Sequence, residues 1–138
     1  MSLKIRRATK EDSKTIEELL KVLYRPEMMW TQEKTEKRME EGKEYYLLIN
    51  QEAVGALELE GNELTALGIK EERKGYGKML VEFGEDLIKS RGYDSAYLYT
   101  LEANKARGFH EKMGFKLEET IPNLVDDQTG YKYSKVFK

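Results

Sequence analysis

A strand, a short basic glycine loop and a helix follow one another in mid-chain, and this order constrains the fold most. The apolar run 64–69 predicts a strand, and 79–89 carries apolar residues at helical spacing. Between them, Arg73-Lys74-Gly75-Tyr76-Gly77-Lys78 has two glycines that allow a tight turn and a close approach to a ligand. Free N–H groups at the helix start favour a phosphate. The segment therefore indicates either an anion site or a glycine-containing turn at a solvated basic helix start.

The composition indicates one small domain. With 138 residues the chain is expected to form a single domain, 1–138, around one core. Charged residues make up 36% of the chain, yet the net charge is only −2, which argues against a dedicated nucleic-acid-binding protein. There is no cysteine and a single histidine, which excludes disulfides, thiolate metal sites and a histidine-rich zinc site. We expect no bound metal.

The sequence also bears on location. It has no apolar run of membrane-spanning length, and its N-terminus lacks the apolar stretch of a signal peptide. We therefore expect a cytoplasmic protein that binds neither membrane nor nucleic acid.

Apolar periodicity predicts an α/β domain in which most neighbouring strands are antiparallel. The helix 75–90 separates two strands that should run parallel, 63–69 and 95–101, as a crossover connection. The helix 31–41 is poor in apolar residues and is expected on the surface. The other expected elements are strands at 3–8, 45–49, 53–60, 115–120 and 131–137, helices at 9–25 and 104–113, and a polar loop at 123–130.

Two segments resemble known motifs. The segment from Leu67 to Leu87 resembles the acetyl-CoA-binding motif of the GNAT family, the GCN5-related N-acetyltransferases: Gln or Arg, two residues, Gly, one residue, then Gly or Ala. The segment 104–115 resembles the family's later motif, in which an Asn precedes a short helix that ends with aromatic residues, a Lys and Gly-Phe. The segments lie in the family's order, separated by one strand. The similarity covers nearly the whole chain, because residues 3–16 also resemble the first segment of the family's sequences.

The resemblance implies a fold and a cofactor. The fold is a GNAT-type mixed, mostly antiparallel sheet with helices on both faces and a central parallel strand pair that splays to hold CoA. The cofactor is acetyl-CoA, with its pantetheine arm beside β-strand backbone and its pyrophosphate on the amides of the glycine loop. The implied cofactor-binding residues are Leu67, Gly68, Ile69, Arg73, Lys74, Gly75, Tyr76, Gly77, Lys78, Asn104, Phe109 and Lys112.

The chain departs from the family pattern at two places. The loop between Ile69 and Gly75 is shorter than usual, so that in strict register Glu72 takes the place of the family's Gln or Arg. A carboxylate facing pyrophosphate is unfavourable, so we expect Arg73 to serve instead. The spacing from Asn104 to Phe109 is also short. These departures leave the fold intact and put the affinity for acetyl-CoA in question.

The implied reaction moves an acetyl group from a thioester to an amine. A primary amine has a pKa near ~10 and is mostly charged at neutral pH, so it needs a base before it can attack. Without cysteine, no cysteine-linked acyl intermediate can form, and direct attack in a ternary complex is expected. Candidate bases are Glu58, Glu60 and Glu63, which together would form an acidic cleft for a cationic amine. Each is otherwise an ordinary solvated carboxylate at a strand end.

Aromatic residues supply further candidates. Tyr97 and Tyr99 share one face of a strand next to the cofactor gap, or are simply good strand formers. His110 stands where the family commonly carries a Tyr that donates to the departing thiolate, although a lone histidine on a short helix is often structural. Tyr24, Met28, Met29 and Trp30 would form a wall over the acceptor site, or serve as core packing or a dimer contact.

Several alternatives stay open. The acceptor is a small amine, a polyamine, an amino-sugar or a protein amine, and the family's frequent dimers make a homodimer a further expectation. One rival interpretation is a non-catalytic CoA-binding protein or regulatory subunit, motivated by the short loop and by His110. Another is an α/β interaction module that binds neither substrate.

Overall fold

The computed structural model describes residues 3–21, 30–125 and 127–137. The described residues form one sheet, four α-helices and two 3-10 turns. The strands are β1 (Lys4–Arg7), β2 (Glu44–Asn50), β3 (Glu52–Glu60), β4 (Glu63–Ile69), β5 (Ser95–Leu101), β6 (Lys116–Val125) and β7 (Gln128–Val136). The helices are α1 (Ser13–Leu20), α2 (Gln32–Glu40), α3 (Tyr76–Ser90) and α4 (Arg107–Lys112), and the 3-10 turns are η1 (Lys10–Asp12) and η2 (Glu102–Asn104).

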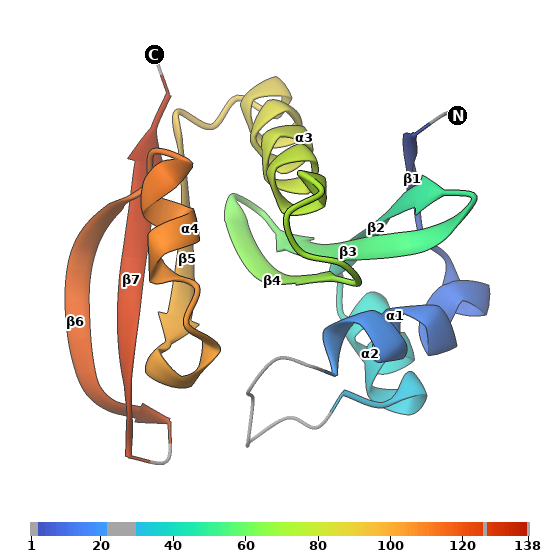
Figure 1. The fold of residues 1–138 in the computed structure, drawn as a ribbon, viewed down its shortest axis with the longest axis horizontal. Helices are drawn as coiled ribbons and strands as arrows, with labels where there is room; N and C mark the ends of the chain where they lie inside the picture. The colour runs from blue at the N-terminus through green and yellow to red at the C-terminus, as the bar shows by residue number, and fades with distance from the viewer. Residues whose placement is uncertain (1–2, 22–29, 126, 138) are drawn as a thin grey trace.

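The strands are arranged in the order β1-β2-β3-β4-β5-β7-β6. Neighbouring strands are antiparallel except β4 and β5, which run parallel and are joined through α3 (Figure 1). This confirms the predicted α/β class, with its mostly antiparallel sheet and one central parallel pair.

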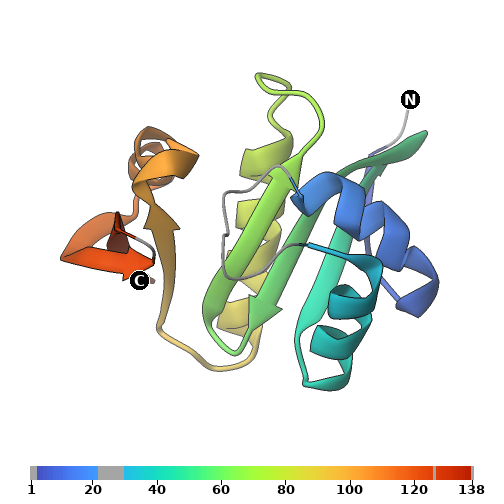
Figure 2. The same cartoon turned by 90° about the horizontal axis from the view of Figure 1, so that it is seen from below.

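Helices cover both faces of the sheet (Figure 2). On one face, α3 packs Val81 and Ile88 into a core cluster with Leu57 of β3. On the other face, α1 packs Ile16 and Leu20 into a second cluster. Strand β2 contributes alternate residues to the two clusters, which explains why it is apolar on both faces.

The parallel strands β4 and β5 stay together only near their amino ends. Their paired position is Glu63 with Tyr97, and the Tyr97 N–H donates to the Asn62 carbonyl oxygen at 3.1 Å. Beyond this point the two strands diverge toward their carboxyl ends (Figure 2). The splayed central pair that the resemblance implied is therefore present, and it opens the sheet beside the glycine loop.

Local capping follows the sequence signals at the first two helices. The Thr9 N–H donates to the Asp12 carboxylate at 2.9 Å, as the threonine–aspartate spacing predicts. Thr31 Oγ1 accepts from the Lys34 N–H at 3.1 Å and begins α2. Gly42, with φ +101°, follows its end. Helix α2 is polar, as expected, but its Arg38 side chain donates to the buried Glu58 carboxylate.

Two predicted boundaries were wrong. The expected helix 104–113 begins only at Arg107, because Lys105 adopts a left-handed conformation, φ 52°, and Asn104 belongs to η2. The expected polar loop 123–130 is largely β-structure, since β6 continues to Val125 and β7 starts at Gln128. Strand β6 lies at the sheet edge and is mostly exposed, so its polar sequence resembles a loop.

Candidate functional site

The glycine loop leads directly into the first turn of α3. Gly75 precedes the helix with φ +79°, a conformation that favours glycine, and its carbonyl oxygen accepts from the Met79 N–H at 3.1 Å. Upstream of Met79, the N–H groups of the first turn have no carbonyl partner within the helix. Arg73, Lys74 and Lys78 are exposed around them. This geometry suits an anion.

Other residues of the loop region are fixed by packing. The Tyr76 hydroxyl accepts from Asn50 Nδ2 at 3.0 Å, which anchors the helix start. A Cβ added at Gly77 would lie 3.2 Å from the Phe109 ring, and one at Gly68 would lie 2.2 Å from the Leu19 carbonyl oxygen. Packing alone therefore accounts for glycine at these two positions, and their role at the cofactor stays a prediction. The close approach of Gly77 to Phe109 brings the start of α3 against α4.

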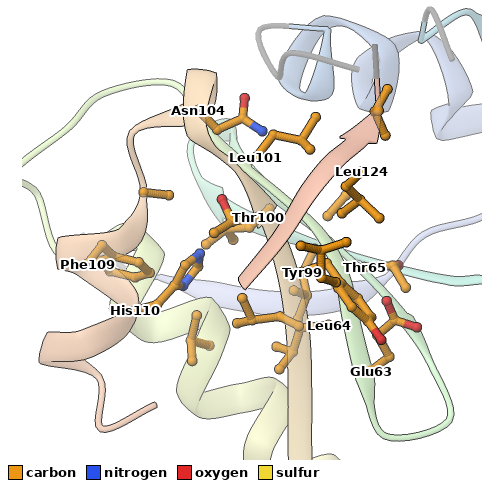
Figure 3. Close-up of a pocket in the computed structure, with 18 residues that line it drawn as sticks. Glu63, Leu64, Thr65, Tyr99, Thr100, Leu101, Asn104, Phe109, His110 and Leu124 are labelled. Carbon is orange, nitrogen blue, oxygen red and sulfur yellow. The ribbon is translucent and has the colours of Figure 1, made fainter. Parts of the chain in front are cut away.

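A cavity of about 490 Å³ occupies the space between the diverging strands β4 and β5 (Figure 3). Three predicted cofactor residues, Leu67, Asn104 and Phe109, line it. Sequence reasoning missed Leu124 and Val125 of β6, which close one side, because that stretch was predicted as a loop. The volume lies in the range of small-molecule sites.

The cavity has two unlike sides. On the side that faces α3, buried aliphatic residues meet Thr100 and His110. On the opposite side lie Glu63, Thr65 and Tyr99, which is 41% exposed. Strand alternation produces this division, because Leu98 and Thr100 point away from Tyr99. Thr100 was not among the predicted site residues, although its alternation with two tyrosines was a usable signal.

His110 is a neutral histidine at the cavity wall. Its side chain is only 9% exposed, and burial lowers its pKa to about 4. Its Nδ1 atom is buried and has no hydrogen-bond partner among the described residues. The ring packs against Phe109, Phe115 and Tyr133. The imidazole is thus both part of an aromatic cluster and a polar group at the cavity (Figure 3).

Glu58 is not a solvated strand-end carboxylate. It is fully buried and accepts two hydrogen bonds from Arg38, at 2.7 and 2.6 Å, and one from Thr65 Oγ1 at 2.6 Å. The Tyr45 hydroxyl also donates to it. Burial alone would raise the pKa of Glu58, but these donors hold that pKa below its ordinary value. Arg38 was missed by sequence reasoning, because nothing in a polar helix marks a buried ion pair.

The three predicted carboxylates do not form one acidic cleft, and this expectation was wrong. Glu58 is enclosed by its partners, and Glu60 forms an ion pair with Lys43 at 3.0 Å. Glu63 alone of the three lines the cavity. A bulge separates them: Glu58 pairs with Ala66 and Leu59 with Leu64, so that Thr65 is an extra residue in β4.

The two tyrosines of β5 lie on the same face, as predicted. Their rings meet edge to face with centroids 6.0 Å apart, and Lys132 Nζ lies 5.1 Å from the Tyr97 ring centroid. Burial and the nearby Glu63 carboxylate raise the pKa of Tyr97. Tyr99 lines the cavity, whereas Tyr97 sits beside Glu63 at its closed end.

The remaining predicted site residues lie elsewhere. Lys112 is exposed at the end of α4 and does not line the cavity. Trp30 is buried in the cluster beneath α1, with the Arg38 guanidinium 5.5 Å from its ring centroid, so it belongs to the core. Tyr24, Met28 and Met29 lie outside the described residues.

The described residues also bear on metal binding and on membrane insertion. The described residues contain no group of three or more His, Cys, Asp or Glu side chains placed to hold a metal ion. Within the described part of the chain, no helix combines the length and apolarity needed to cross a membrane.

The profile of the Acetyltransferase (GNAT) family matches residues 11–115. No curated protein sequence matches the chain.

Solved structures share the whole fold. The ribosomal-protein-S18-alanine N-acetyltransferase of Escherichia coli superposes with a TM-score of 0.80 at 15% identity, covering 99% of this chain and 95% of that one. The PaiA N-acetyltransferase of Thermoplasma acidophilum, solved with coenzyme A, gives 0.75 at 21% identity, covering 99% and 100%. The spermidine/spermine N-acetyltransferase of Vibrio cholerae gives 0.76 at 16% identity, covering 98% and 95%. At such identities the likeness shows the fold.

Proposed function

The chain belongs to the GNAT acetyltransferase family, and from this premise we propose that it is an N-acetyltransferase that moves an acetyl group from acetyl-CoA to a primary amine. The observation that carries the proposal is the cavity between β4 and β5, whose lining residue Phe109 lies close to Gly77 in the first turn of α3. A basic glycine loop at a helix start, together with a mostly apolar cavity, suits a ligand with phosphates at one end and an acyl thioester at the other.

The residues present fit such a cofactor. The amides of the first turn of α3 and the exposed Arg73, Lys74 and Lys78 would hold the pyrophosphate. Residues Leu67 to Ile69 lie on β4 beyond its paired position with β5, so their backbone edge is available to an extended pantetheine arm. Asn104 and Phe109 line the other side of the cavity.

Glu63 is the proposed base. When bound, acetyl-CoA supplies an activated acetyl group as a thioester. A protonated amine would be drawn to the Glu63 carboxylate, which takes its proton directly or through water. The neutral amine nitrogen would then bond to the thioester carbonyl carbon as the carbon–sulfur bond breaks, and the second proton that the nitrogen loses would leave with the departing sulfur as the thiol. Because Glu63 is the one predicted carboxylate at the cavity, a cationic acceptor such as a polyamine or a peptide amine is favoured.

His110 is the proposed donor to the departing sulfur. Its low pKa keeps the imidazole neutral at physiological pH, so one ring nitrogen carries a hydrogen that can bond to the thiolate. We expect His110→Ala to lower turnover about a hundredfold or more with little change in acetyl-CoA affinity. We expect His110→Tyr to retain much of the activity. If His110→Ala turned over at the parent rate, His110 would be structural, and Tyr99 or water would be assigned as the donor instead.

A two-step experiment tests the proposal. Thermal unfolding is first measured with and without acetyl-CoA; ligand at about 100 times its Kd should add roughly 2.7 kcal/mol of stability. Release of CoA is then followed with a panel of polyamines, amino-sugars and peptides. Binding without turnover on any amine would favour the non-catalytic CoA-binding alternative. The absence of a thermal shift would contradict both the N-acetyltransferase and the non-catalytic CoA-binding protein.

A further inference from the structure

The cavity reaches the apolar core beneath α3. The arm would lie along Leu67 to Ile69, toward the carboxyl end of the strand. The cavity wall, however, continues to four aliphatic side chains that belong to the core beneath α3 and are each at most 6% exposed: Leu57, Leu64, Val81 and Leu98.

This deep part is closed at its far end. Glu63 and Tyr97 bring β4 and β5 together there. Helix α3 covers it closely, since a Cβ added at Gly84 would lie 3.1 Å from both Leu57 and Leu64. The deep part is therefore a blind space with a tightly packed wall.

The two sides of the cavity suit different ligands. The side that faces α3 is aliphatic, and the polar groups that the described residues place at its edge, Thr100 and His110, are neutral. A charged amine there would lose its hydration without compensation. The opposite side offers Glu63, Thr65 and the exposed Tyr99 (Figure 3). The amine is therefore expected on that side, and an apolar group on the side that faces α3.

We infer that the space lined by Leu57, Leu64, Val81 and Leu98 is an acyl-chain pocket, and that this protein prefers a donor whose straight acyl chain is longer than acetyl, such as butyryl-CoA or hexanoyl-CoA. The inference rests on the proposed function as a CoA-dependent transferase and extends it from acetyl to longer acyl groups. The reaction is unchanged: the amine forms an amide with the acyl carbon, and CoA leaves as the thiol.

The test is a binding series on the whole protein with CoA, acetyl-CoA, butyryl-CoA and hexanoyl-CoA, using calorimetry. Each methylene that enters an apolar pocket tightens binding roughly fourfold, equivalent to about 0.8 kcal/mol. Butyryl has two methylenes more than acetyl, so we expect butyryl-CoA to bind about sixteenfold more tightly than acetyl-CoA. Transfer to the best amine, as kcat/KM, should rise in the same order.

A matched pair of variants locates the pocket. Val81→Phe fills the space from α3, and it should abolish the advantage of butyryl-CoA while leaving the affinity for CoA within about threefold. Ile88 lies two turns along the same face of α3, is buried in the same core, and does not line the cavity. Ile88→Phe should therefore keep the chain-length preference.

The outcomes separate this inference from the proposed function. If CoA and acetyl-CoA bind but affinity stays flat or falls with chain length, the acyl-chain pocket is wrong and the proposed function stands. If no CoA ester binds, both are wrong. Should Val81→Phe fail to fold, the smaller substitution Val81→Leu and the wild-type binding series still test the acyl-chain pocket.

Discussion

Glu63 of β4 and Tyr97 of β5 are the one paired position along these two fully described strands. The pairing is parallel and lies at the amino end of both strands, and beyond it the strands separate around the cavity. The same contact closes the cavity and holds a carboxylate at its wall. The contact also places the Tyr97 hydroxyl near the Glu63 carboxylate, which together with burial raises the pKa of Tyr97.

The glycine before α3 provides a direct test of the anion site. Gly75 and Gly92 flank the two ends of α3, both have positive φ, and an added Cβ would meet nothing within 4 Å at either. Alanine at either position should therefore cost a similar amount of stability, about 1–2 kcal/mol, from backbone strain alone. Only Gly75→Ala should weaken CoA binding, which calorimetry measures. Equal affinities for the two variants would contradict the pyrophosphate assignment.

Glu63 and Glu60 form a matched pair for the proposed base. They are cross-strand neighbours, but Glu63 lines the cavity and Glu60 pairs with Lys43. We expect Glu63→Gln to lower kcat by about a hundredfold or more with little change in the affinity for acetyl-CoA. Glu60→Gln should stay near the parent rate. Steady-state kinetics over a pH series would show the loss, and a parent-like rate for Glu63→Gln would move the base elsewhere.

The buried imidazole should make the protein sensitive to acid. Because the pKa of His110 is about 4 when folded and ordinary when unfolded, the unfolded chain binds the proton more readily between pH ~6.5 and pH ~4. Stability from this residue is complete above pH ~6.5 and is lost as pH falls, by roughly 3 kcal/mol at pH ~4. Denaturant unfolding of wild type and His110→Phe should diverge over this range. Parallel curves would show that the imidazole is not held neutral.

The ion pair beneath α2 should contribute to stability. Glu58 is fully buried, so Arg38→Met leaves a buried carboxylate without its cation and should cost about 3–5 kcal/mol. Adding Glu58→Gln to that variant should restore part of the loss. Lys10→Met, which breaks the exposed Lys10–Glu40 contact to the same helix, is the control and should cost nothing measurable. Comparable losses in the two single variants would refute the argument.

Elements with strong local signals were predictable. Strands β4 and β5 were placed from apolar pattern with the bounds that the structure has, and the caps at Thr9 and Thr31 followed from spacing. Predictions failed where local sequence carries little information. An exposed edge strand such as β6 has the polarity of a loop, and the left-handed Lys105 that delays α4 is not marked by its residue type.

By itself, the sequence determined the order of elements and the glycine loop, because periodicity and glycine conformation act over a few residues. The distribution of the carboxylates was decided only by tertiary structure. A bulge at Thr65 and an arginine from α2 bury Glu58, and the contact of Glu63 with Tyr97 leaves Glu63 at the cavity. Whether a carboxylate meets solvent, a cation or a ligand depends on neighbours distant along the chain, and strand alternation cannot specify those neighbours.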